Sequence, residues 1–200
     1  MRDSPTGRRS GRIVEVEAYA GETDLASHAR FGQTSRNAVM FGPPGIAYVY
    51  LVYGMHDCLN IVTEPPGTAA AVLVRAVEPE DGIDAMRQSR LERLGRRRRV
   101  DEEAVVRDRD RLARLPAERL ASGPGLVCAA FDIDRSLTGI DLCDPSSPLR
   151  LEARRPDEPE PLIVAGRRVG VAYAGEGWAN RPWRLAVARS PSVSGPPLGG

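Results

Sequence analysis

Hydrophobic and polar residues alternate along residues 11–19, and this alternation predicts a β-strand with two different faces. One face would carry Ile13, Glu15, Glu17 and Tyr19, and the other Arg12, Val14, Val16 and Ala18. We expect one face to join the core, while the other presents carboxylates and an aromatic ring.

A second alternating run predicts a β-hairpin over residues 47–62. Its first strand, 47–53, would send Ala47, Val49 and Leu51 to one side and Tyr48 and Tyr50 to the other. Tyr53 precedes Gly54, where the chain must turn, so a large aromatic would stand at the hairpin tip with little core to join. Exposed apolar tips of this kind usually insert into a partner.

The apolar run 68–77 predicts a buried strand in which Arg75 is the charged exception and needs a carboxylate or water beside it. A helix is predicted to start at Pro79 and to end near Gly95, and a short one to cover 126–131. Further strands are predicted over 150–153, 162–164, 168–172 and 182–188, with a turn at 165–166.

The remaining stretches predict irregular structure. Residues 1–10 are expected to be a loop or a frayed end, and 190–200 a flexible tail. The connection over 20–46 is unusually long, as functional loops are. Since no β-α-β alternation is visible, we predict an α+β (mixed α/β) fold: a single domain over 1–189, with a curved, mostly antiparallel sheet, a protruding β-hairpin and a few packing helices.

Composition narrows the function. A chain of 200 residues that is 42% hydrophobic suits one core. No apolar run reaches the ~20 residues of a membrane span and the N-terminus lacks a secretory pattern, so a cytoplasmic protein is expected. The net charge of +1 is not the strongly basic signature of a nucleic-acid binder, although local patches can serve. Cys58, Cys128 and Cys143 show no spacing typical of zinc or of a disulfide framework.

The chain contains no lysine, so all 28 of its basic side chains are arginines. Arginine stays protonated and cannot act as an amine nucleophile. Schiff-base chemistry through lysine is therefore excluded, and only the N-terminal amine could replace it.

Glu17, Arg75, His28 and the tyrosines could form a hydrolytic site in which a carboxylate takes a proton from water and an arginine fixes its charge. The alternative is a structural ion pair, and Glu15 fits the pattern as well as Glu17. His28 could equally be structural, and the tyrosines could be strand formers. The arginine-rich segment 96–119, with its block Arg96–Arg99, predicts either a solvated helical face or phosphate contacts.

Several blocks of the sequence resemble the alkyladenine (3-methyladenine, or methylpurine) DNA glycosylase family. They follow one another along most of the chain as GRIVEVEAY, ASHA, TSRNAVMFGPPG, YVYLVYGMHDCLN, AAAVLVRAVEP, SGPG, RVGVAYAG and RPWRL. The resemblance implies a single mixed α/β domain with a hairpin that enters the minor groove of DNA.

The resemblance also implies a role for individual residues. Glu17 is similar to the general base that deprotonates water, with Arg75 and the backbone carbonyl of Val169 as the other groups that hold this water. Tyr19, His28 and Tyr50 correspond to the walls around a flipped base, Asn60 to the residue that rejects guanine, and Tyr53 to the side chain that fills the gap in the duplex.

The first hypothesis is thus a monofunctional DNA glycosylase of base-excision repair. It would release 3-methyladenine, 7-methylguanine, hypoxanthine or ethenoadenine from double-stranded DNA, act as a nucleoid-associated monomer and need no cofactor or metal. The second is a DNA-damage binding module, catalytically weak because the helix and strand that usually precede GRIVEVEAY are missing from this sequence. A third is an RNA-binding domain of the same architecture.

Overall fold

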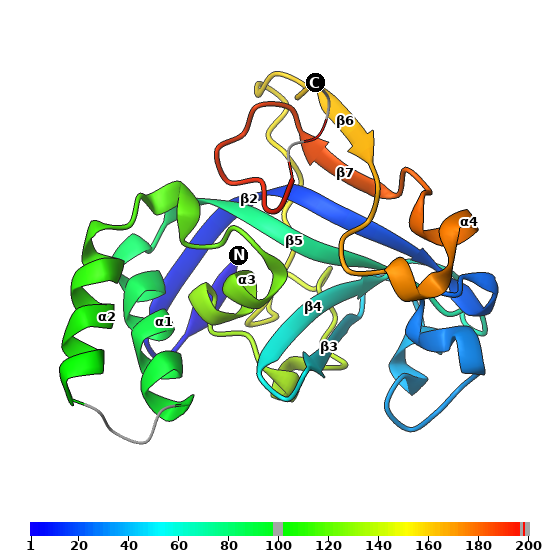
Figure 1. Ribbon diagram of the computed structural model, residues 1–200, viewed down its shortest axis with the longest axis horizontal. Coiled ribbons are helices and arrows are strands. Elements are labelled where there is room, and N and C mark those ends of the chain that lie inside the picture. Colours follow the sequence, from blue (N-terminus) through cyan, green and yellow to red (C-terminus); the bar gives the residue numbers. More distant parts are fainter. Residues whose placement is uncertain (98–101, 197, 199–200) are drawn as a thin grey trace.

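The long strands β2 (Gly7–Ala20) and β5 (Ala70–Asp81) cross the middle of the molecule side by side in the computed structural model (Figure 1). The structure describes residues 1–97, 102–196 and 198. Within them a seven-stranded sheet runs in the order β3-β4-β5-β2-β7-β6, with β1 paired to β2 outside this path. All of its pairings are antiparallel, so the prediction of a mostly antiparallel sheet in a single α+β domain is confirmed.

The remaining elements are short. The other strands are β1 (Arg2–Ser4), β3 (Ala47–Val52), β4 (His56–Val62), β6 (Ile163–Gly166) and β7 (Arg184–Val187). The helices are α1 (Ile83–Arg97), α2 (Glu102–Arg114), α3 (Pro124–Ala130) and α4 (Glu176–Ala179). Single 3-10 turns are η1 (Gly21–Thr23), η2 (His28–Phe31), η3 (Ala38–Phe41), η4 (Ala117–Arg119), η5 (Arg135–Leu137) and η6 (Ala172–Ala174).

The main core lies between α3 and one face of the sheet. Val49, Leu59 and Val74 of the strands pack with Val127 and Phe131 at α3. Each fully buried aliphatic side chain of this kind stabilises the fold by about 1.5–3 kcal/mol. The predicted alternation of β3 is confirmed, since Ala47 and Val49 join this core while Tyr48 and Tyr50 belong to a second cluster.

The N-terminal residues are better ordered than the sequence predicts. The expected loop over 1–10 is wrong, because β1 pairs with the start of β2. Arg9 is fully buried there, and its guanidinium donates to Ser4 Oγ and Ser89 Oγ, both at 2.6 Å. This strand is held by hydrogen bonds between polar side chains. Because it lacks alternating apolar residues, the hydrophobic pattern did not predict it.

Four other expectations, about a helix start, two strands and a turn, are wrong. Pro79 lies in β5 opposite Gly11, next to an irregularity in the register, and α1 begins only after Gly82 (φ +76°). Residues 150–153 and 168–172 are not strands, and the predicted turn at 165–166 falls inside β6. Arginines in those two irregular stretches bind distant partners: Arg150 pairs with Asp3, and Arg168 pairs with Asp24.

The end of the chain packs against the sheet. We expected a flexible tail from residue 190, and this needs correction for its described residues, because Ser192 and Ser194 are buried. Arg119 donates to the carbonyl oxygens of Pro191 (3.0 Å) and Val193 (3.3 Å), and the Ser194 N–H donates to Glu15. Polar partners, among them the buried Glu15, therefore hold this segment in place.

Part of the arginine-rich segment lies in α2. The side chains described there are mostly exposed, apart from the buried Leu112, and this exposure suits a solvated helical face and phosphate contacts alike. The block Arg96–Arg99 falls on positions whose side chains lie outside the described residues. None of the described helices is long and apolar enough to cross a membrane.

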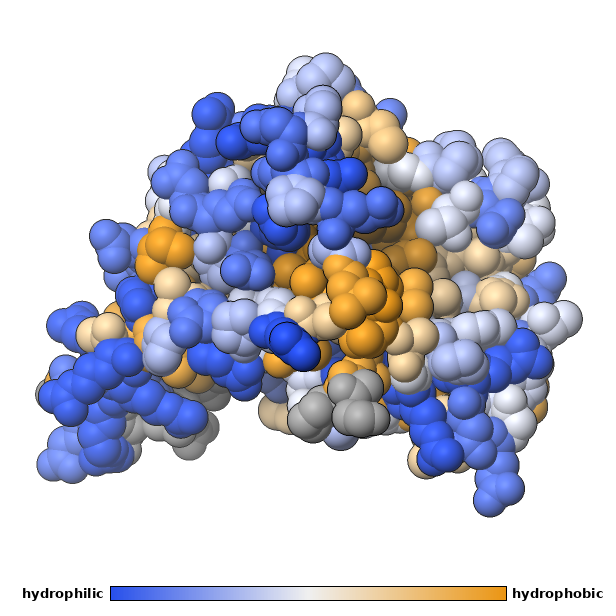
Figure 2. All heavy atoms as spheres, turned by 90° about the horizontal axis from the view of Figure 1, so that it is seen from above, coloured by the Kyte–Doolittle hydropathy of each residue, from blue (hydrophilic) through white to orange (hydrophobic). Residues whose placement is uncertain are grey.

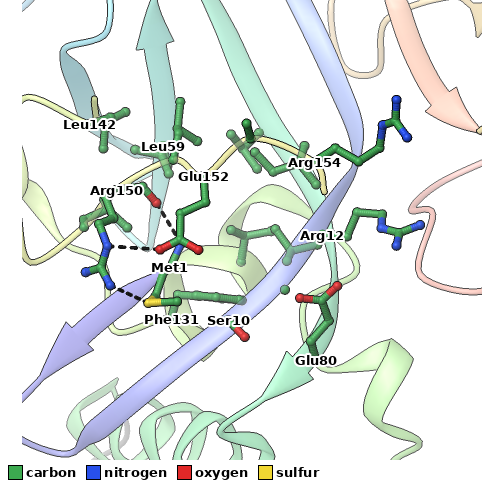
Figure 3. A pocket seen from close by; sticks show the side chains of 18 of the residues that line it. Met1, Ser10, Arg12, Leu59, Glu80, Phe131, Leu142, Arg150, Glu152 and Arg154 are labelled. Carbon is green, nitrogen blue, oxygen red and sulfur yellow. Dashed lines mark hydrogen bonds and ion pairs between the residues drawn. The ribbon is translucent and has the colours of Figure 1, made fainter. Parts of the chain in front are cut away.

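A cavity of about 420 Å³ lies on the core face of the sheet, where Figure 3 shows Arg150 close to Met1 and Glu152. Leu59 of β4 lines it, whereas its neighbour Asn60 lines a smaller pocket. Because successive side chains of a strand point to opposite faces, the two spaces lie on opposite sides of the sheet. None of the site residues predicted from the sequence lines the larger one.

Apolar side chains are also exposed at the β6–β7 end of the sheet. Leu162, Ile163 and Leu185 are 73%, 50% and 41% exposed. Seen from above, the surface is largely hydrophilic with a hydrophobic patch near its middle (Figure 2).

Candidate active site

Glu17 is the fully buried carboxylate at the centre of the candidate site. Its Oε1 accepts a hydrogen bond from the Val169 N–H (2.7 Å) and lies 3.2 Å from Arg75 Nη1. Its Oε2 accepts from the Tyr19 hydroxyl at 2.9 Å. An ionised carboxylate has about four acceptor positions, so these three donors leave room for one more, such as a water molecule.

Glu15 is the second buried carboxylate of β2, and it is held by two arginines. Its Oε1 accepts from Arg75 Nε (2.8 Å) and Arg184 Nε (2.7 Å), and its Oε2 accepts from the Ser194 N–H (2.6 Å). Burial alone would raise the pKa of Glu15, but these hydrogen bonds outweigh it and the pKa is lowered. Two carboxylates and two guanidinium groups thus balance in a buried cluster, which removes the cost of an unpaired charge.

A pocket of about 50 Å³ opens beside this cluster and is lined by aromatic residues from several elements. A water molecule needs about 10–15 Å³ of such space, so the pocket has room for a few water molecules. Tyr19, His28, Tyr50 and Asn60 all line it, so the structure brings together the four residues that the sequence predicts as base-binding. Tyr19 connects the pocket to Glu17, because its ring lines the pocket and its hydroxyl donates to the carboxylate.

The rings of His28 and Tyr50 form one wall, with their centroids 4.2 Å apart in an edge-to-face arrangement. His28 Nδ1 and the Tyr48 hydroxyl share a hydrogen bond of 3.2 Å. Burial, with the guanidinium groups of Arg36 and Arg30 nearby, lowers the pKa of His28 to about 4. The ring is therefore neutral at pH 7, and this wall of the pocket adds no positive charge.

The long connection over 20–46 is organised by Asn37, which is buried. Its amide nitrogen donates to the carbonyl oxygens of His28 (3.1 Å) and Gly32 (3.0 Å), and its oxygen accepts from the Thr34 N–H (2.6 Å). These bonds fix the backbone of the loop on both sides of η2. They explain how a segment without long regular elements can hold His28 in one place.

Asn60 lies in the floor of the pocket on β4, nearly fully buried. Its amide nitrogen donates to the carbonyl oxygens of Tyr48 (3.2 Å) and Cys58 (3.4 Å). The orientation of this side chain is therefore set by its own hairpin.

Tyr53 stands at the tip of the β3–β4 hairpin and is 85% exposed. Tyr53 (φ +50°) and Gly54 (φ +68°) both have positive φ, and the Met55 N–H donates to the Val52 carbonyl at 3.0 Å. Positive φ at two central residues is typical of type I′ turns, and it is uncommon for a residue with a bulky side chain. The structure thus keeps Tyr53 apart from the pocket residues and presents it to solvent.

Sequence reasoning missed several residues of the site. Arg168 and Asp24 form a fully buried bidentate pair, with bonds of 2.5 Å and 3.0 Å, and the Arg168 guanidinium lies 4.8 Å from the Tyr19 ring centroid. Burial would raise the pKa of Asp24, but the hydrogen bonds from Arg168 and the Ala26 and Ala20 amides lower it. Arg184 and Ser194 were missed as well, since nothing local in their sequence marks them as partners of Glu15.

A further group lies at the mouth of the pocket. The Arg30 guanidinium lies 4.5 Å from the ring centroid of Phe31 and 5.2 Å from that of Tyr173. Phe31 is 82% exposed and Tyr173, which lines the pocket, is 61% exposed. An exposed stack of one cation and two aromatic rings therefore borders the entrance.

The chain also contains possible metal ligands and three cysteines. The described residues contain no cluster of three or more His, Cys, Asp or Glu side chains placed to hold a metal ion. Cys58 and Cys128 are buried and Cys143 is exposed, and none of the three is in a disulfide. Burial raises the pKa of Cys58 to about 12, so this thiol stays protonated at neutral pH.

Comparison with known proteins gives the family of this chain. Residues 1–191 match the family model described as "Methylpurine-DNA glycosylase (MPG)". A protein of Methanocella arvoryzae named "Putative 3-methyladenine DNA glycosylase" is 47% identical over 97% of this chain and 84% of its own length. A protein of the same name from Myxococcus xanthus is 45% identical over 96% of this chain and 81% of its own.

The human protein named "DNA-3-methyladenine glycosylase" is 44% identical over 97% of this chain and 60% of its own length. These matches define the class as that of the DNA glycosylases. The chain belongs to the methylpurine-DNA glycosylase family, as the resemblance in its sequence blocks predicts.

Proposed function

We propose that this protein is a base-excision repair glycosylase that hydrolyses the N-glycosidic bond of damaged purines in double-stranded DNA, with a water molecule activated by Glu17. The observation that carries the proposal is the buried Glu17 carboxylate, held by Arg75 and the Val169 N–H and joined through Tyr19 to an aromatic pocket. Members of the family are DNA glycosylases by name, and DNA is the substrate that this membership implies.

The target base must leave the duplex to reach such a pocket, at a cost of a few kcal/mol that is least for a damaged pair. The exposed ring of Tyr53 would fill the gap, as apolar wedges do in proteins that enter the minor groove. Arg30, Phe31 and Tyr173 would meet the displaced strand at the pocket mouth, where a cation suits phosphate and an aromatic face suits a base.

The flipped base would lie between Tyr19 on one side and the His28–Tyr50 wall on the other. Purines alkylated at N3 or N7 carry positive charge, and an aromatic pocket attracts a cation by roughly 1–2 kcal/mol. A neutral His28 supports this selectivity, because a protonated ring would repel the charged base. Asn60 would reject guanine through a clash with its exocyclic amine.

The reaction would transfer a proton from the water to Glu17 as the water oxygen bonds to the anomeric carbon. The bond between this carbon and the base nitrogen breaks, and its electron pair leaves with the base, so that an abasic site remains. The carboxylate also stabilises the oxocarbenium character of the sugar. Arg75 would pair with the Glu17 carboxylate, and the Val169 carbonyl would help to hold the water.

The proposal also covers strand cleavage, oligomeric state and cofactor. Without lysine the enzyme would be monofunctional and would leave the strand intact. It would work as a monomer at the nucleoid without a cofactor. The second hypothesis, a binding module with weak catalysis, uses the same pocket and hairpin and differs in the fate of the base.

The test is a single-turnover assay on a labelled duplex that holds one hypoxanthine or one alkylated purine, with strand cleavage scored before and after alkali. We expect base release, with nicks only after alkali. Nicks without alkali would contradict a monofunctional enzyme. A duplex that stays bound with its base in place would replace the proposal by the binding module.

A further inference from the structure

Arg75 uses each of its guanidinium nitrogens on a different partner. Nε donates to Glu15 Oε1 (2.8 Å), Nη1 lies 3.2 Å from Glu17 Oε1, and Nη2 donates to Ser194 Oγ (3.1 Å). The first two partners belong to β2, but the third comes from the last residues of the chain. One of the three partners of Arg75 therefore lies 119 positions away in the sequence.

Ser194 is bound to this cluster by its backbone as well as by its side chain. Its N–H donates to Glu15 Oε2 at 2.6 Å, and its carbonyl oxygen accepts from Arg184 Nη2. The residue is 5% exposed, so these bonds are shielded from water. The N–H, the carbonyl oxygen and the hydroxyl of Ser194 therefore all bind members of one buried ionic cluster.

The next residue, Gly195, lies close to Val169 and Arg184. Gly195 has φ +66°, and a Cβ built there would lie 3.6 Å from Val169 Cγ2 and 3.7 Å from Arg184 Nη2. Gly195 therefore lies near Val169, whose N–H binds Glu17, while Ser194 binds Arg75, whose Nη1 pairs with Glu17.

We infer that Ser194 is a positioning residue for the reaction: with the segment 190–196 it holds Arg75 in the orientation that pairs with Glu17, so that the end of the chain completes the catalytic centre. This inference rests on the proposed function. It adds to that function a residue whose hydroxyl holds Arg75 and whose backbone holds Glu15 and Arg184.

A matched pair of variants tests it. Ser194→Ala removes the hydroxyl, which accepts from Arg75 Nη2 and also bonds Glu15, and leaves the backbone bonds of residue 194 intact. Ser192→Ala is the control, because Ser192 lies in the same segment, is fully buried, and its Oγ has no hydrogen-bond partner in the part of the chain that the structure describes. Ser194→Thr restores the hydroxyl.

The first readout is the single-turnover rate of base release at saturating enzyme, with affinity for an abasic duplex measured alongside. We expect Ser194→Ala to slow release about tenfold at unchanged affinity, as for the loss of one hydrogen bond to a charged group. Ser192→Ala should keep the parent rate and Ser194→Thr should recover most of it. Equal rates for Ser194→Ala and Ser192→Ala would overturn the inference, and so would a loss confined to affinity.

The second readout does not depend on activity. In protein labelled with ¹⁵N at arginine, restricted rotation of the Arg75 guanidinium should be seen for the parent and Ser192→Ala and lost in Ser194→Ala. If the parent releases no base, the proposed function fails, whereas unchanged Arg75 signals in Ser194→Ala would overturn the positioning role alone.

Discussion

Glu15 and Glu17 lie two residues apart on β2, both are buried, and both pair with Arg75, yet their other partners differ. Glu15 also binds Arg184 and the Ser194 N–H, which belong to the buried ionic cluster. Glu17 binds the Val169 N–H and the hydroxyl of Tyr19, whose ring lines the pocket. The same residue type on the same strand therefore has two sets of partners, and of the two carboxylates Glu17 is the one joined to the pocket through Tyr19.

The largest expected effect on stability separates the two carboxylates. Glu15→Gln should lower the free energy of unfolding by about 3 kcal/mol or more, since it leaves Arg184 without its buried counter-charge. Glu17→Gln should cost only about 1–2 kcal/mol, because Arg75 keeps Glu15. Denaturant unfolding at pH 7 measures both, and equal losses would contradict the division of roles between them.

The sequence predicts much of this site because its parts lie close together in the chain. Glu17 and Tyr19 share a face by alternation, and Tyr48 and Tyr50 do so on β3. The choice of Glu17 over Glu15 required the family resemblance, since the strand pattern fits both residues. The hydrogen bond from Tyr19 joins Glu17, and not Glu15, to the pocket, and the role of Glu17 in catalysis stays a prediction.

The missing parts of the prediction involve partners that are distant in sequence. Ser194, Arg184 and the Asp24–Arg168 pair form buried polar contacts over long separations, and neither hydrophobic period nor turn chemistry marks such contacts. The described tail residues were expected to be flexible for the same reason. Residues 150–153 and 168–172 have strand-like composition, but their arginines bind distant carboxylates instead of continuing a ladder.

The tip of the β3–β4 hairpin is exposed, in contrast to the buried pocket. Tyr53→Ala should leave the free energy of unfolding nearly unchanged, because the side chain is 85% exposed. Affinity for a duplex with a damaged base should fall about tenfold, as expected when one aromatic stacking contact of about 1–3 kcal/mol is lost. Binding titrations at fixed salt measure this. Met55→Ala, which also alters the exposed tip, is the control and should have a smaller effect.

The pH dependence of stability tests the pocket wall. The folded state lowers the pKa of His28 from 6.5 to about 4, so between these values the unfolded chain binds more protons than the folded one. Stability from this group is complete above pH 6.5 and is lost as the pH falls toward 4. The slope should stay below about 1.4 kcal/mol per pH unit because the ring is only partly buried.

His28→Gln provides the matching comparison. Urea unfolding from pH 7 to pH 4.5 should show a shallower decline for this variant than for the parent. A decline of the same steepness in both proteins would mean that His28 does not titrate as its burial implies.

The smallest expected effect concerns Asn60. Asn60→Ala should leave release of hypoxanthine near the parent rate and raise release of undamaged guanine about three- to tenfold, since a pocket that loses one steric contact discriminates only weakly. Competition between the two bases in otherwise identical duplexes measures the ratio. An unchanged ratio would assign the rejection of guanine to another wall of the pocket.

We propose that Glu17, and not Glu15, activates the water. The most direct test of this claim is the single-turnover rate of base release by the parent, Glu17→Gln and Glu15→Gln at saturating enzyme, each corrected for the folded fraction. We expect Glu17→Gln to bind an abasic duplex like the parent. Its rate of base release should fall by at least about a hundredfold, as for a missing general base. Glu15→Gln should retain measurable release. Release by Glu17→Gln at the parent rate would contradict the claim.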